Sequence, residues 1–138
     1  MNYNQPTDVL IIDDDVVNNF IAETLIKRAS KHTNITVCLN GRDAIEKLLS
    51  IKQESGKLPE FIFLDLAMPV MDGWKFLDEY HRLNIGDGSN SQIIILSSSI
   101  FRHDIDRALK HSVVKEYISK PLNMELIRKV LKIDHHIN

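Results

Sequence analysis

The chain has 138 residues, the length of one ordinary domain, and its 43% hydrophobic and 26% charged residues exclude a disordered or fibrous protein. A formal net charge of -2 argues against strong attraction to nucleic acid or to an anionic membrane. Cys38 is the only cysteine, which excludes a disulfide framework and a thiolate metal cluster, and we interpret it as a small apolar strand residue. We find neither a secretory pattern in residues 1–7 nor an apolar run of membrane-spanning length, so we expect a soluble, cytoplasmic protein.

Short apolar runs alternate with helical patterns along the chain. The runs that we interpret as strands are residues 9–12, 35–39, 61–64, 93–96 and 116–119. Apolar residues at helical spacing follow each run: Val17, Ile21, Leu25 and Ala29; Ala44, Leu48 and Ile51; Phe76, Tyr80 and Leu83; Ile105, Ala108 and Leu109; Leu126, Val130 and Ile133. Polar residues suited to starting helices precede four of these patterns: Asp15, Asn40, Asp72 and Asn123.

Five βα units in succession predict an α/β fold, a parallel sheet with helices on both faces. We expect one domain over residues 1–138, with a core at about 8–133 and frayed ends. We interpret residues 53–59 and 84–92 as solvated connections, on the side away from the carboxyl ends of the strands.

Polar residues gather where the predicted strands end. They are Asp13, Asp14 and Asp15 after the first strand, Asp65 after the third, Ser97, Ser98 and Ser99 after the fourth, and Lys120 with Pro121 after the fifth. Each signal alone is ordinary, because a strand-end Asp is usually a cap or turn residue, as we interpret Asp15, and a serine run is usually a loop. Ligands of open α/β sheets bind at this edge, however, and the joint placement favours a site.

The chemistry of this set suits phosphoryl transfer. Adjacent carboxylates repel unless a cation intervenes, and Mg²⁺ prefers oxygen ligands, so Asp14 and Asp65 are candidates to bind it directly and Asp13 through water. Asp65 is then the candidate nucleophile, since carboxylates form acyl phosphates. Lys120 would offset charge on the phosphoryl oxygens, and Ser97 would donate a hydrogen bond to one of them.

Four segments carry a resemblance to the response regulator receiver family, which covers roughly residues 8–133. Residues 9–15 resemble its first strand and acidic pair, and residues 63–74 contain its phosphoacceptor pattern D-x-x-M-P-x-M-D-G. Residues 95–98 resemble its switch hydroxyl, Ser97, followed by a small residue, Ser98. Residues 117–121 resemble its aromatic switch position, Tyr117, and its Lys-Pro pair.

The resemblance implies a flavodoxin-like, doubly wound (βα)5 fold with a five-stranded sheet of order 2-1-3-4-5. It implies a Mg²⁺ site formed by Asp13, Asp14, Asp65 and the backbone carbonyl of Ala67, and a cis bond before Pro121. Phosphorylation of Asp65 would draw Ser97 towards the phosphoryl group, let Tyr117 turn inward, and alter the face formed by the fourth helix, fifth strand and fifth helix.

The resemblance also implies partners. The donor would be a histidine kinase or a histidine phosphotransfer protein that docks beside the first helix. On that helix we expect most of Val17, Phe20, Ile21 and Leu25 to be core. We expect Asn18 or Ile21 to face the partner. Output would pass to an unidentified protein target, without direct nucleic-acid binding or membrane insertion, from a monomer or a weak, phosphorylation-dependent dimer. The chain would not be an enzyme beyond self-catalysed phosphoryl transfer and autodephosphorylation.

Two positions depart from the pattern of many family members. Ala67, two residues after the phosphoacceptor, offers no polar side chain to steer water, and Ser99 lies at the other position that tunes the lifetime of the phosphoryl group. We expect an altered but not abolished dephosphorylation rate.

Three alternative classes of protein share part of this pattern. A haloacid dehalogenase-type phosphatase would use Asp13 as its nucleophile, within Asp13-x-Asp15, but it has no need of the loop at 65–73. A degenerate receiver acting only as an interaction module would have lost a site residue, and none is lost. A nucleotide-binding Rossmann domain is disfavoured because no glycine-rich turn follows the first strand.

Overall fold

The computed structural model describes residues 6–68, 70–98 and 101–131, which form five strands and five helices in alternation. The strands are β1 (Thr7–Ile12), β2 (Thr33–Cys38), β3 (Phe61–Asp65), β4 (Gln92–Ser97) and β5 (Val114–Ser119). The helices are α1 (Val16–Ala29), α2 (Gly41–Glu54), α3 (Gly73–Arg82), α4 (Arg102–Leu109) and α5 (Met124–Leu131). The sheet is parallel throughout, with order β2-β1-β3-β4-β5, which confirms the expected doubly wound topology.

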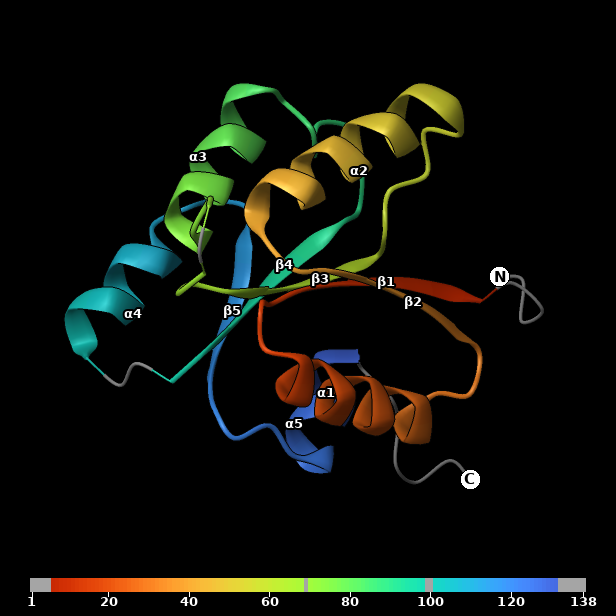
Figure 1. Ribbon diagram of the computed structural model, residues 1–138, viewed down its shortest axis with the longest axis vertical. Helices are drawn as coiled ribbons and strands as arrows, with labels where there is room; N and C mark the ends of the chain where they lie inside the picture. The colour runs from red at the N-terminus through yellow and green to blue at the C-terminus, as the bar shows by residue number, and fades with distance from the viewer. Residues whose placement is uncertain (1–5, 69, 99–100, 132–138) are drawn as a thin grey trace.

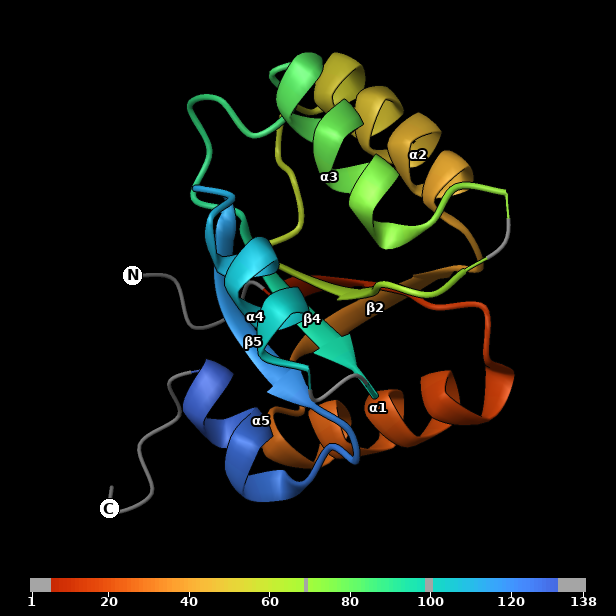
Figure 2. The same cartoon turned by 90° about the vertical axis from the view of Figure 1, so that its left-hand side faces the viewer.

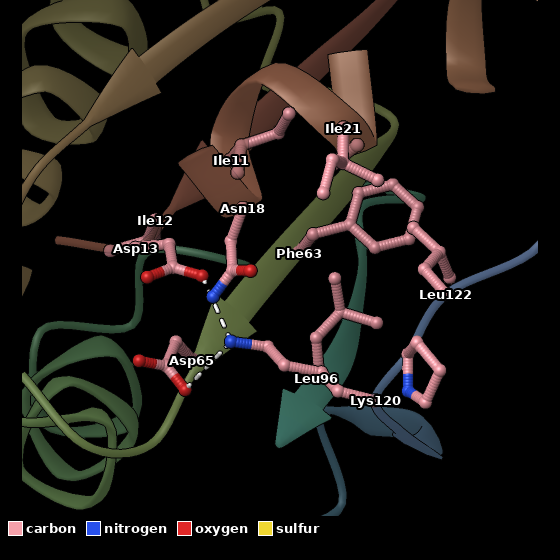
Figure 3. A pocket seen from close by; sticks show the side chains of 12 residues that line it. Ile11, Ile12, Asp13, Asn18, Ile21, Phe63, Asp65, Leu96, Lys120 and Leu122 are labelled. Carbon is pink, nitrogen blue, oxygen red and sulfur yellow. Dashed lines mark hydrogen bonds and ion pairs between the residues drawn. The ribbon is translucent and has the colours of Figure 1, made fainter. Parts of the chain in front are cut away.

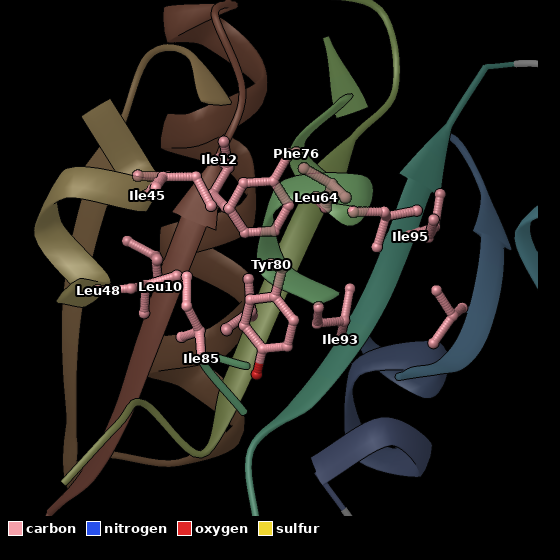
Figure 4. Packing of buried hydrophobic residues seen from close by; sticks show 14 of the residues in the cluster. Leu10, Ile12, Ile45, Leu48, Leu64, Phe76, Tyr80, Ile85, Ile93 and Ile95 are labelled. Atoms are coloured by element: carbon pink, nitrogen blue, oxygen red, sulfur yellow. The ribbon is translucent and has the colours of Figure 1, made fainter. Parts of the chain in front are cut away.

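Helices cover both faces of the sheet, as Figures 1 and 2 show. α1 and α5 lie on one face, and α2, α3 and α4 lie on the other. Side chains alternate across a strand, so β1 sends Leu10 and Ile12 into the core under α2 and α3 and sends Val9 and Ile11 into the core over α1 and α5. Figure 4 shows the first core, where Tyr80 of α3 lies among the aliphatic side chains. Burial on both faces explains why the strands read as continuous apolar runs.

Side-chain hydrogen bonds cap the starts of α1, α2, α3 and α5, as the sequence predicted. Asp15 accepts hydrogen bonds from the backbone of Val17 and Asn18. The other three capping bonds run from the backbone N–H groups of Asp43, Lys75 and Leu126 to the side chains of Asn40, Asp72 and Asn123 respectively. Because only short segments join them, α1 starts close to the carboxyl end of β1 and α3 starts close to that of β3.

The buried stripe of α1 differs from the prediction. We expected most of Val17, Phe20, Ile21 and Leu25 to be core, but Val17 and Phe20 are 66% and 69% exposed. Ile21, one of the two residues expected to face a partner, is exposed. The buried side chains are instead Asn19, Ala22 and Ile26. α1 carries apolar residues on more than one side, so the helical period by itself could not say which side faces the sheet.

The connections at the far edge of the sheet also differ from the prediction of solvated loops. Leu58, before β3, and Ile85, before β4, are buried. The Lys52 ammonium of α2 donates hydrogen bonds to the carbonyl oxygens of Asn84 and Ile85, at 2.6 and 2.9 Å. Burying Ile85 while satisfying its carbonyl makes this loop part of the packed structure. No helix among the described residues is long and apolar enough to cross a membrane.

Candidate functional site

Three carboxylates meet at the carboxyl ends of β1 and β3. Oxygen atoms of Asp13, Asp14 and Asp65 lie within 4.8 Å of one another. Asp13 and Asp65 are buried and Asp14 is exposed. β1 and β3 are neighbours although β2 separates them in the chain, and this reversal of strand order creates the crevice in which the carboxylates lie.

Lys120 extends from the end of β5 towards the same point (Figure 3). Its Nζ lies 3.1 Å from Oδ2 of Asp13 and 3.6 Å from Oδ1 of Asp65. Its backbone N–H donates to the carbonyl of Ser97 at 2.8 Å, which fixes the end of β5 against the end of β4. The Lys120–Pro121 bond is cis, as the resemblance implied.

The electrostatics of Asp65 show an excess of negative charge. The pKa of its carboxyl is raised from 3.8 to about 6, chiefly by burial and less by the charges of Asp13 and Asp14, while the Lys120 ammonium and a backbone hydrogen bond from Ala67 oppose the rise. One ammonium therefore does not compensate three carboxylates in a partly dry crevice. A hard divalent cation with oxygen ligands fits this donor set, and the carboxylates of Asp13, Asp14 and Asp65 are the groups that would hold it.

Asp13 is held by both of its carboxylate oxygens. Oδ1 accepts from the backbone N–H of Asp15 at 2.9 Å, and Oδ2 faces Lys120. Its backbone carbonyl accepts a hydrogen bond from the amide of Asn19, also at 2.9 Å. Sequence reasoning missed Asn19; a buried amide in the first turns of a helix has no periodic signal, although an Asn in an otherwise apolar stretch is a hint.

The switch residues named from the sequence lie on β4 and β5. Ser97 is buried at the end of β4, beside Asp65 at the end of β3, and Ser98 is exposed. Tyr117 pairs with Ile95 across the β4–β5 ladder and packs, partly buried, against the core under α2 and α3. Ser99 lies outside the described residues. The carbonyl of Ala67 as a metal ligand stays a prediction.

The loop from β3 to α3 packs tightly against the site. A Cβ at Gly73 would lie 2.7 Å from the carbonyl oxygen of Asp65 and 2.7 Å from Cα of Leu66, so only glycine lets α3 start there. Val70, in the same loop, has a φ of 68°, a left-handed conformation that is costly for a β-branched residue. Sequence reasoning recognised the glycine within a motif but gave no sign of the strain at Val70.

The family model for the response regulator receiver domain matches residues 9–132. The chain belongs to this family. The receiver is 32% identical over 133 residues to the sensor histidine kinase CheAY of Helicobacter pylori, covering 94% of the chain and 15% of that protein. It is 29% identical over 131 residues to the nitrate/nitrite response regulator NarL of Escherichia coli K12, and the match covers 95% of this chain and 56% of NarL. The receiver thus spans about half the length of NarL and a much smaller part of CheAY.

Solved structures agree with the fold of the receiver. A two-component response regulator from Cytophaga hutchinsonii superposes with a TM-score of 0.84 at 29% identity, covering 94% of this chain and 96% of the other. A CheY from Borrelia burgdorferi, solved in complex with CheX, BeF3 and Mg²⁺, superposes with a TM-score of 0.76 at 26% identity. The match covers 96% of this chain and 94% of the other. Receiver domains of this family bind Mg²⁺ at an acidic cluster, and the haloacid dehalogenase-type alternative finds no support.

Proposed function

We propose that the receiver accepts a phosphoryl group on Asp65 from a histidine kinase or a histidine phosphotransfer protein, in a reaction that requires Mg²⁺. The observation that carries this proposal is the meeting of three carboxylates within 4.8 Å of one another with the Lys120 ammonium between two of them. Asp13, Asp14 and Lys120 come from two separate strand ends, and all of them surround the carboxylate of Asp65.

The chemistry follows from the positions of these groups. A carboxylate oxygen of Asp65 attacks phosphorus, the bond from phosphorus to the donor nitrogen breaks, and an acyl phosphate forms. The Lys120 ammonium, which lies 3.6 Å from Oδ1 of Asp65, donates a hydrogen bond to a phosphoryl oxygen, and the Ser97 hydroxyl donates to another. Asp13, Asp14, Asp65 and the carbonyl of Ala67 would hold Mg²⁺, which would supply positive charge to offset that of the phosphoryl oxygens.

The exposed side of α1 supports a docking role. Val16, Val17, Phe20 and Ile21 expose apolar side chains on the helix whose first turn is capped by Asp15, next to Asp13. Contiguous exposed apolar surface of this kind marks protein interaction sites. We assign it to the phosphodonor, because a protein bound there lies beside the phosphoacceptor.

The output surface is the face formed by α4, β5 and α5. Ser97 adjoins Lys120 through a backbone hydrogen bond, and Tyr117 lies on β5, so movement of Ser97 towards a new phosphoryl group alters contacts along this strand.

Turnover is limited to self-catalysed phosphoryl transfer and autodephosphorylation. Ala67 is exposed beside the site, and Ala67→Asn is expected to change the half-life of the phosphorylated form; equal half-lives for the two proteins would contradict this role.

The test is intact mass after incubation with Mg²⁺ and acetyl phosphate. The wild type should gain one phosphoryl group, and Asp65→Asn, or the wild type in EDTA, should gain none. Asp72→Asn is the matched control: it changes an aspartate in the same loop, keeps an N-cap at α3, and should label like the wild type. Labelling of Asp65→Asn, or none of the wild type with acetyl phosphate or a panel of kinases, would overturn the proposal.

A further inference from the structure

Two neighbouring asparagines of α1 lie in different surroundings. Asn18 lines a cavity of 290 Å³ that opens beside Asp65. Asn19 is buried, with an exposed fraction of 4%, and it heads the buried stripe that Ala22 and Ile26 continue along the helix. A leucine at this position would extend the apolar stripe, so burial by itself does not account for an amide there.

The Asn19 amide is held in one orientation. Its Nδ2 donates a hydrogen bond to the backbone carbonyl of Asp13 at 2.9 Å. The reverse orientation would set Oδ1 against that carbonyl, and two acceptors repel, so Oδ1 faces away. Among the described residues Oδ1 is buried and has no hydrogen-bond partner. Because a buried oxygen without a partner is unfavourable, the hydrogen bond to Asp13 is what this side chain contributes.

The carbonyl that Asn19 holds belongs to the peptide between two acidic residues of the site. β1 ends at Ile12, so the Asp13 carbonyl lies past the last residue of the strand. A peptide unit is planar, so a hydrogen bond to this carbonyl also fixes the N–H and the Cα of Asp14. On the other side of Asp14, the N–H of Asp15 donates to Oδ1 of Asp13 at 2.9 Å. Asp14 is exposed, yet the peptides on both sides of it are held in place.

We propose that Asn19 is a positioning residue of the metal site: it holds the Asp13–Asp14 peptide so that both carboxylates stay beside Asp65, and it thereby raises the affinity for Mg²⁺. This inference rests on the Mg²⁺ site of the proposed function. Asn19 acts only through the peptide that it holds. Groups that orient metal ligands in this way contribute about 10–100-fold to metal affinity. The unpartnered oxygen offsets the stabilising effect of the hydrogen bond, so Asn19 contributes to metal affinity rather than to stability.

The test compares the Mg²⁺ affinity of the wild type with that of Asn19→Leu, for the full chain without a phosphodonor. MgCl₂ is titrated, and the shifts of backbone amide resonances give the dissociation constant. Leucine has the branched shape of asparagine but no hydrogen-bonding groups, so the dissociation constant should be about 10–100-fold higher than that of the wild type. Because the unpartnered oxygen is lost along with the amide, the midpoint of thermal unfolding in EDTA should lie within about 4 °C of that of the wild type.

Thr33→Val is the matched control for a loss of stability alone. Thr33 is also buried, and its hydroxyl donates to the carbonyl of Ser30 at 3.1 Å, at the amino end of β2. This variant should unfold at a lower temperature and bind Mg²⁺ with the dissociation constant of the wild type. Equal dissociation constants for Asn19→Leu and the wild type, or the same rise in Thr33→Val, would overturn the inference. Asn19→Ala, which removes the amide and adds no atoms, replaces Asn19→Leu where the leucine variant does not fold.

A measurement on the wild type alone gives an independent check. If the hydrogen bond from Asn19 to Asp13 favours bound Mg²⁺, then bound Mg²⁺ favours that hydrogen bond by the same factor. The side-chain amide protons of Asn19 should therefore exchange with water about tenfold more slowly in saturating Mg²⁺ than in EDTA. Equal exchange rates would overturn the inference and leave phosphorylation of Asp65 standing. A wild type that binds no Mg²⁺ would overturn the metal requirement of the proposed function, and the inference with it.

Discussion

Two lysines at opposite ends of the strands face partners of different kinds. At the amino ends of the strands, Lys52 donates to the carbonyls of Asn84 and Ile85 and holds in place the loop that buries Ile85. At the carboxyl edge, Lys120 lies between Asp13 and Asp65, two buried carboxylates, and one positive charge faces two negative ones.

The two lysines differ in whether their partners are fully compensated. The partners of Lys52 are neutral carbonyls that need only hydrogen bonds. Both carbonyls receive them, so no uncompensated charge remains there. The pKa of Asp65 is raised to about 6, chiefly because its carboxylate is buried and also because Asp13 and Asp14 repel its charge, although Lys120 opposes the rise. The carboxyl edge is thus destabilising until a cation and a phosphoryl group arrive, which is the usual cost of a preorganised site.

The largest expected effect is that of Asp65→Asn. Besides abolishing labelling, it should raise the free energy of unfolding at pH 7, without metal, by about 2–3 kcal/mol, because ionised Asp65 is disfavoured in the folded state by a pKa raised from 3.8 to about 6. Urea unfolding in EDTA measures this. A less stable variant would show that the carboxyl edge is not strained by Asp65.

The same shift sets a pH dependence. The folded state holds the Asp65 proton more tightly than the unfolded chain, so the wild type loses stability relative to Asp65→Asn as the pH rises from about 3.8 to about 6. Above that window the difference should be constant. Unfolding curves for both proteins at several pH values, in EDTA, test this; a constant difference across the window would contradict it.

Lys52→Met should have a smaller effect of the opposite kind. Loss of the hydrogen bonds to Asn84 and Ile85 should lower the free energy of unfolding by about 1–2 kcal/mol, with labelling by acetyl phosphate unchanged. Lys47→Met, an exposed position on the same helix, is the matched control and should change neither quantity by more than about 0.5 kcal/mol. A loss of labelling in Lys52→Met would break the division between the two edges.

Val70→Asn tests strain at the carboxyl edge without changing a charge. Asparagine tolerates a φ of 68° better than valine, so the variant should be more stable by about 1 kcal/mol. Thermal and urea unfolding measure it, with Val17→Asn as a control on another exposed valine, which lies in regular helix. A gain no greater than that of the control would show that the strain carries no cost.

The smallest effect is expected where α3 meets α4. The Arg107 guanidinium lies 4.0 Å from the centre of the Trp74 ring, and Arg107→Gln should cost about 0.5–1 kcal/mol. Trp74 is the only tryptophan, so its fluorescence reports the loss of this contact directly. Arg102→Gln, on the exposed surface of the same helix, should leave the emission unchanged.

The sequence alone determined the order of elements, the helix caps and the residues that end each strand. These are local properties: an apolar run shows a strand buried on both faces, and Asp15 or Asn40 caps the helix that follows it in the chain. Placing Asp65 and Lys120 at one edge needed only the rule that parallel strands end together. The site could therefore be predicted before any distance was known.

Tertiary packing alone decided the rest. Which side of α1 is buried depends on how the helix lies on the sheet, so Val17 and Phe20 are exposed where their spacing suggested core. Burial of Ile85 depends on Lys52, more than thirty residues earlier in the chain. The raised pKa of Asp65 and the cavity beside it require the desolvation and the gap between α1, β3 and the start of the α5 loop. A local pattern cannot specify these features, because each depends on segments that come together only in the folded chain.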